Sequence, residues 1–159
     1  MSDPNRAIAG RIRLELAELA RVAERACRIW AEVRPSPDDF LVDAVALNLH
    51  SFYAGLEHIF ELVADRVDHA LPSGPSWHQE LLRQMAAELP GVRPAAVTVD
   101  LMDRLDRYRG FRHVVRNVYT YNLDVRQIAT LMDDLPAVEA QLRDELTGFA
   151  QMLEQISQD

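Results

Sequence analysis

The chain has 159 residues, of which 48% are apolar and 26% charged, and its formal net charge is −8. This composition is typical of a single globular domain with an ordinary core. The acidic balance argues against general coating of nucleic acid, which requires a broad basic surface, but it leaves room for one focused basic cleft.

Cysteine content and the length of apolar runs indicate the cellular compartment of the protein. Cys27 is the only cysteine, so no intrachain disulfide forms, and its apolar helical surroundings predict a buried, inert thiol. The first ten residues lack the apolar run of a signal peptide, and no apolar run reaches membrane-spanning length. We therefore expect a cytoplasmic protein that does not contact membranes.

Two long helices are predicted in the first half of the chain. Apolar residues recur at three- and four-residue steps from Asn5 to Val33, which is typical of an amphipathic helix. Ser36 is predicted to cap a second helix, with Pro37 at its first position. This helix is expected to run from about Asp38 to Ala70, and its broad apolar face predicts a central place in the fold.

Shorter elements follow. A third helix is expected to start at Ser76, with Gln79 as its capping-box partner. Residues 95–122 have a helical pattern in which Gly110 marks a kink or a boundary. A short helical turn is expected up to Met132, and the last helix is expected to open at residues 133–136. The pattern predicts one all-α domain over residues 1–159, an antiparallel bundle of four long helices plus one or two short ones.

The most informative stretch of the sequence is a basic and aromatic island in residues 104–121. Guanidinium groups bind phosphate bidentately, and aromatic faces stack on bases. An acidic chain does not produce such an island by composition alone, so we interpret it as a binding surface. Its members are Arg104, Arg107, Tyr108, Arg109, Phe111, Arg112, Arg116, Tyr119 and Tyr121.

The segment Phe111–Tyr119 resembles the signature of HepT-like proteins, within the wider group of HEPN ribonucleases. That motif consists of an Arg, four to six residues, a His and, in HepT proteins, a Tyr two positions later. Arg112 and Tyr119 match the Arg and the Tyr, and Asn117 stands in the place of the His. Residues 51–57 and 77–82 and the pair Arg93-Pro94 are also similar, so the resemblance spans roughly residues 40–125.

The resemblance implies an all-helical, HEPN-like fold and a homodimer with the motif near its interface. It further implies metal-independent RNA cleavage without a cofactor, as the toxin of a toxin–antitoxin pair. The implied partner is a minimal nucleotidyltransferase antitoxin, which in some systems adenylylates the motif tyrosine, here Tyr119.

The chemistry of such cleavage fits some of these residues. Arg112 suits the charged phosphorane, since its fork is always protonated. A His suits proton transfer near neutrality, whereas Asn117 does not titrate in a useful range. His113 is the only imidazole in the motif, and Arg107 with His113 provides a second register with acceptable spacing. Both registers remain open, with Arg107, Arg109 and Arg116 as further candidates for phosphate binding.

Helix geometry constrains the site. At about 100° per residue, Arg112, Arg116 and Tyr119 share a face, and Asn117 points roughly 140° away from Arg112. Convergence of Arg112 and Asn117 would require an irregular helix or a second subunit. Two functions therefore remain: a HepT-like ribonuclease toxin, and a non-catalytic dimerising module that binds a nucleotidyltransferase.

Other histidines suggest less. His58 and Glu61 have metal-ligand spacing, but no matching Glu-x-x-His motif occurs elsewhere, so no metal site is predicted. Together with His50, Glu57 and His69, they are interpreted as solvated or core-edge residues. Trp77 and His78 are interpreted as a packing anchor with a capping imidazole.

Overall fold

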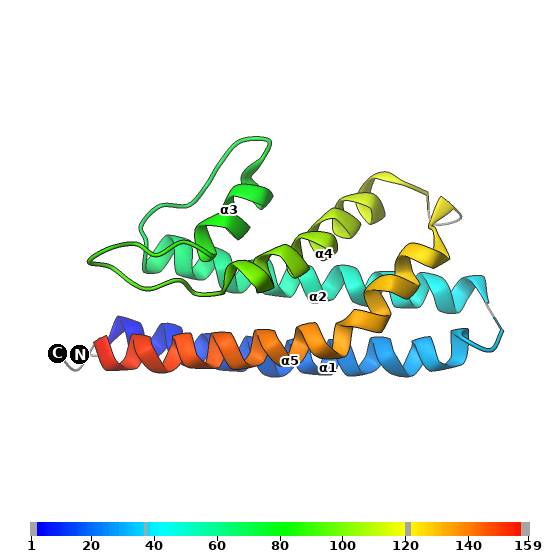
Figure 1. Ribbon diagram of the computed structural model, residues 1–159, viewed down its shortest axis with the longest axis horizontal. Helices are drawn as coiled ribbons and strands as arrows, with labels where there is room; N and C mark the ends of the chain where they lie inside the picture. Colours follow the sequence, from blue (N-terminus) through cyan, green and yellow to red (C-terminus); the bar gives the residue numbers. More distant parts are fainter. Residues whose placement is uncertain (1–2, 37, 120–121, 157–159) are drawn as a thin grey trace.

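The fold is an all-α bundle, as the sequence predicts. The computed structural model describes residues 3–36, 38–119 and 122–156, and these form α1 (Pro4–Val33), α2 (Asp39–Arg66), α3 (Trp77–Met85), α4 (Val99–Asn117) and α5 (Val125–Ile156). The three longest helices run along the long axis, and α3 and α4 lie on the far side of α2 from α1 (Figure 1). Along the chain, α1, α2, α4 and α5 alternate in direction (Figure 1), which confirms the antiparallel bundle.

Helix α1 begins and ends close to its predicted bounds. The Asp3 carboxylate accepts a hydrogen bond from the Asn5 backbone at 3.0 Å, and Pro4 occupies the first turn. Its apolar stripe packs against both α2 and α5. Cys27 is half-buried rather than fully buried, and burial raises the pKa of its thiol.

Helix α2 is central, since it contacts all four other helices. Its predicted cap is wrong: Asp38 rather than Ser36 caps the helix, accepting from the backbone N–H groups of Phe40 at 2.8 Å and Leu41 at 3.3 Å. A carboxylate at this position satisfies two unpaired donors and complements the helix dipole, which a hydroxyl two residues earlier does not. Pro37 lies outside the described residues.

The turn after α2 comes earlier than predicted. The helix ends at Arg66 instead of near Ala70, and His69 has a positive φ of 53°. Ser76 is the residue before α3, but its side chain makes no capping hydrogen bond, so the predicted capping box with Gln79 is wrong. The backbone at Ser76 is not extended, with ψ at 18°, which does not aim the hydroxyl at the helix.

Helix α4 is shorter than the predicted 95–122 segment. Thr98 caps it by accepting from the Leu101 N–H at 3.2 Å, and the helix passes through Gly110 without a boundary. Its buried side chains end at Phe111; no residue from 112 to 119 is buried. The second half of α4 therefore projects from the bundle.

Helix α5 corrects the prediction of a separate turn before Pro136. One helix runs from Val125 to Ile156 with Pro136 inside it, and it changes direction in its first half (Figure 1). Proline removes one backbone donor and bends a helix, but buried residues on both sides keep the two halves in one element. Near the bend, the Tyr108 hydroxyl donates to the Leu131 carbonyl at 2.7 Å. No helix in the described part of the chain is long and apolar enough to cross a membrane.

Candidate functional site

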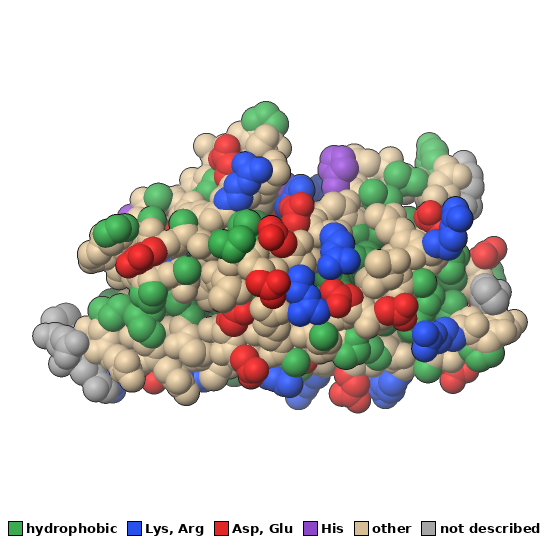
Figure 2. Space-filling view, in the orientation of Figure 1, with side chains coloured by type: hydrophobic (Ala, Val, Ile, Leu, Met, Phe, Trp, Pro, Cys, Tyr) green, Lys and Arg blue, Asp and Glu red, His purple; other side chains and the backbone are tan. Residues whose placement is uncertain are grey.

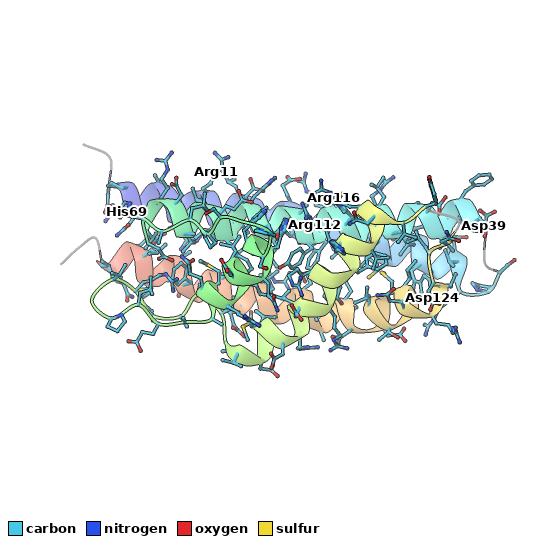
Figure 3. All side chains as sticks on the ribbon, turned by 90° about the horizontal axis from the view of Figure 1, so that it is seen from above. Arg11, Asp39, His69, Arg112, Arg116 and Asp124 are labelled. Carbon is cyan, nitrogen blue, oxygen red and sulfur yellow. The ribbon has the colours of Figure 1, made fainter. Side chains whose placement is uncertain are left out.

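A pocket of about 510 Å³ lies between the first turn of α3 and the second half of α4. Figure 3 shows Arg112 and Arg116 together near the middle of the molecule, where α4 crosses α2. The pocket is therefore formed by segments that are well separated in sequence. Its lining residues are Pro75, Ser76, His78, Gln79, Arg109, Arg112, His113, Arg116 and Asn117.

The α4 wall of the pocket is a single helical stripe. Its members are spaced by three, four, seven and eight residues from Arg109, so all face the same side. Arg112 and Asn117 occupy opposite margins of this stripe. Both therefore line one pocket without the helix irregularity that their angular separation had suggested.

The pocket lining is cationic. Arg109, Arg112 and Arg116 line it together with two imidazoles, and no Asp or Glu is among its described lining residues. Arg109 pairs with Asp106 at 2.7 Å on the same helix, whereas Arg116 has no ion pair within the described chain. The first turn of α3 adds the positive end of a helix dipole. The arrangement favours an anionic ligand.

Glu57, at the base of the site, was missed as a functional residue. Its carboxylate is 2% exposed; Oε1 lies 3.5 Å from Arg112 Nε, and Oε2 lies 2.5 Å from His78 Nδ1. One buried carboxylate thus links helices α2, α3 and α4. A detectable signal existed in the sequence, because Glu57 falls within the apolar stripe of α2 between Leu56 and Phe60.

His78 does not cap α3, contrary to expectation. Its ring contacts Glu57 on one side, and the Trp77 ring lies 3.6 Å away between centroids. Its Nε2 has no hydrogen-bond partner among the described residues, and the side chain lines the pocket with a quarter of its surface exposed. The ring is thus oriented by two contacts and presents one nitrogen to the pocket.

His113 and Asn117 are adjacent at the end of α4. The Asn117 Nδ2 donates to the His113 carbonyl at 2.7 Å and lies 3.3 Å from His113 Nδ1. The first bond fixes which end of the amide faces the imidazole. The amide nitrogen of Asn117 therefore faces the His113 ring, and an amide does not transfer protons near neutrality.

The pKa of His50, on α2, is affected by the charges of the site. Burial, and then the positive charges of Arg112 and Arg116, lower the pKa of this imidazole, while Glu57 opposes them. The electrostatic influence of the pocket thus extends to a neighbouring residue that does not line it.

Some predicted residues lie elsewhere. Arg107 is on the α5-facing side of α4, with Nη2 at 3.6 Å from Asp134, and so it does not share the pocket with His113. Arginine and acidic side chains are intermixed on this side (Figure 2), and Arg104 also pairs with Asp134, at 2.8 Å. Tyr119 is 74% exposed beyond the end of α4 and is not among the pocket-lining residues. Tyr121 lies outside the described residues.

No group of three or more His, Cys, Asp or Glu residues in residues 3–36, 38–119 and 122–156 is arranged to hold a metal ion. His58 and Glu61 lie at a separate surface hollow on α2 with Arg11, Glu15 and other residues.

Comparison with known families gives one result. The model of a family described as HepT-like protein matches residues 44–153, which cover every residue that lines the pocket and Glu57 beneath it. Comparisons with curated proteins and with solved structures give no match.

Proposed function

Because the chain belongs to the HepT-like protein family, we propose that it is a toxin-type endoribonuclease that cleaves RNA without a metal ion in the pocket between α3 and α4. One observation carries the proposal: in a chain of net charge −8, three arginines and two histidines line one pocket with no carboxylate in the described lining. Phosphate is the RNA group that such a lining recognises.

The reaction uses the RNA itself as nucleophile. The 2′-oxygen attacks the adjacent phosphorus, the bond from phosphorus to the 5′-oxygen breaks, and a 2′,3′-cyclic phosphate and a 5′-hydroxyl result. The 2′-hydroxyl proton passes to a base, and an acid gives a proton to the leaving 5′-oxygen. Arg112 and Arg116 bind the phosphate and stabilise the added negative charge, with Arg109 at the pocket edge.

His113 takes over the proton-transfer role of the imidazole that the motif has at position 117. It is one residue from Arg112 and lines the same pocket. The Asn117 amide, 3.3 Å from Nδ1, orients the ring from the other side. Asn117 Nδ2 can only donate, so it orients the neutral ring; when His113 is protonated and serves as the proton donor to the leaving oxygen, both ring nitrogens carry protons and this contact is given up.

We further propose that the active form is a homodimer with the end of α4 near its interface. The exposed half of α4 supports this, as do the exposed apolar side chains Phe40, Leu47 and Val118, which are 83%, 62% and 36% exposed. The beginning of α2 and the end of α4 lie at the same end of the molecule (Figure 1). A second copy covering this end would bury apolar surface and narrow access to the pocket.

Regulation is proposed to act through Tyr119. Its exposed ring is accessible to a minimal nucleotidyltransferase antitoxin, which would transfer AMP from ATP to the phenol oxygen and release pyrophosphate. The added phosphate, two residues from Asn117, would compete with RNA for the pocket arginines. The tests are mass measurement after incubation with the partner and ATP, Tyr119→Phe as control, and relief of growth arrest by the neighbouring nucleotidyltransferase.

A second function, a non-catalytic module that binds nucleotide or the acidic face of a partner, is favoured by Asn117. An amide at the motif position binds phosphate but does not move protons. The two functions differ in whether RNA is cut.

The experiment is incubation of RNA with the protein in excess chelator, with analysis of the product ends. We expect 2′,3′-cyclic phosphate ends, lost in Arg112→Ala and retained in Arg107→Ala, a matched arginine on the opposite side of α4. If the protein binds RNA but cleaves only after Asn117→His, the non-catalytic module is correct. Absence of both cleavage and RNA binding would refute both functions.

A further inference from the structure

Transesterification of RNA requires both a proton acceptor and a proton donor, and the motif supplies only one imidazole. Asn117 cannot fill the second role, and Arg112 remains protonated at all relevant pH values. Within one subunit, the other residues that line the pocket are the candidates for the second proton-transfer group. His78, on α3, is the other imidazole among the described lining residues.

We propose that His78, held by Glu57, is the base that accepts the 2′-hydroxyl proton. This inference rests on the proposed ribonuclease function and adds a residue outside the recognised motif. The ring is presented by α3, its Nδ1 lies 2.5 Å from the buried Glu57 carboxylate, and its Nε2 is left to the pocket.

The contact with Glu57 fixes the tautomer. An ionised carboxylate only accepts hydrogen bonds, so a neutral His78 carries its proton on Nδ1 and keeps the lone pair on Nε2. This is the form a base requires. When Nε2 takes the proton, the positive charge forms beside Glu57, which is buried and has little water to screen it.

The opposite wall completes the arrangement. Arg112 approaches the second oxygen of Glu57, and its Nε, although buried, has no hydrogen-bond partner among the described residues. The Arg112 Nη groups make no hydrogen bonds within the described chain and so remain available for phosphate. His78 and His113 therefore stand on opposite walls of one cationic pocket, as base and acid on either side of a bound phosphate.

Each proton in the proposed reaction has a donor and an acceptor. His78 Nε2 gains the proton of the 2′-hydroxyl as the 2′-oxygen bonds to phosphorus. The protonated His113 loses its proton to the 5′-oxygen as that bond breaks. Exchange with solvent returns both imidazoles to their starting states, with no further reactant.

Three variants test the assignment. His78→Gln retains an N–H that can donate to Glu57 but removes the titrating group, and Glu57→Gln keeps shape while removing the charge that fixes the tautomer. His58→Gln is the matched control, since His58 is exposed on α2 and lines a different hollow. Single-turnover cleavage is measured across pH, and binding is measured with a 2′-O-methyl RNA that cannot react.

We expect His78→Gln to lower the cleavage rate about 10²–10⁴-fold, with binding of the unreactive RNA unchanged, and to abolish the fall in rate at acidic pH that the base produces. Glu57→Gln should lower the rate in the same direction, and His58→Gln should have no effect. Normal cleavage by His78→Gln would overturn the assignment and leave the ribonuclease proposal intact. A loss of binding equal to the loss of cleavage would also overturn it, by making His78 a binding residue. No cleavage by the unaltered protein would refute the ribonuclease proposal and this inference together.

Discussion

Arg93 holds the segment between α3 and α4 in place through an ion pair and several hydrogen bonds, so its replacement should lower the free energy of unfolding. Both Arg93 and Asp68 have fully buried side chains, and Arg93 Nε and Nη2 lie 2.5 and 2.7 Å from the two Asp68 oxygens. The remaining donors reach the carbonyls of Gln84, Ala87 and Pro94 at 3.0–3.1 Å. The segment before α3, which forms one wall of the pocket, begins directly after Asp68.

Arg93→Met keeps much of the side-chain stem but removes every one of these hydrogen bonds. Asp68 is then left buried with the Gln84 amide at 2.8 Å as its remaining hydrogen-bond donor in the described chain. Removing one partner of a buried ion pair costs about 3–5 kcal/mol, because the other charge stays desolvated. At about 2–4 °C per kcal/mol for a chain of this length, Tm should fall by about 6–20 °C.

The assay is urea unfolding followed by circular dichroism, with a thermal melt as a second measurement. Arg126→Met is the control, because that side chain is 94% exposed, and it should change the free energy of unfolding by less than about 0.5 kcal/mol. The double change Arg93→Met with Asp68→Leu should regain much of the loss, since no buried charge remains unpaired. A loss below about 1 kcal/mol for Arg93→Met would refute the reasoning.

Other regions of the molecule yield further predictions. Because the pKa of His50 is lowered below 6.5, the unfolded chain takes up its proton first as the pH falls; the free energy of unfolding should therefore decrease from pH 7 to 5.5, and less so in His50→Asn. Phosphate bound in the pocket should raise the His50 pKa by offsetting the nearby arginines, which NMR titration measures. Tyr108→Phe should cost about 1–2 kcal/mol in urea unfolding, since the buried phenol donates to the Leu131 carbonyl. A double change of Phe40 and Leu47 to Ser should shift the molecular mass measured by light scattering from dimer towards monomer; an unchanged mass would contradict the proposed interface.

The sequence predicts the helices of this fold well because their apolar spacing is regular and long. Periodicity places α1 almost to the residue, but it does not reveal which of several polar residues caps α2, and Asp38 does so instead of Ser36. Pro136 misleads for a related reason. Proline destabilises a helix locally, while burial on both sides of the bend, a tertiary effect, keeps α5 continuous.

The sequence likewise predicts one part of the candidate site and not the other. Local sequence identifies the α4 stripe that contains Arg112, His113 and Asn117, since all three lie within two helical turns. It does not reveal that His78 faces them, because that contact depends on how α3 packs beside α4. The sequence shows Glu57 as a charged residue within an apolar stripe. Its partners, His78 and Arg112, lie 21 or more residues further along the chain, so local sequence patterns do not predict these contacts.

The position of Glu57 connects phosphate binding at Arg112 with the hydrogen bond that holds His78. A phosphate entering the pocket would draw the Arg112 charge towards itself and leave more of the shared carboxylate's field to His78. Arrival of a phosphate would thereby strengthen the contact between this carboxylate and the His78 ring. Phosphate binding at Arg112 and the orientation of His78 would thus be coupled through the two oxygens of one carboxylate.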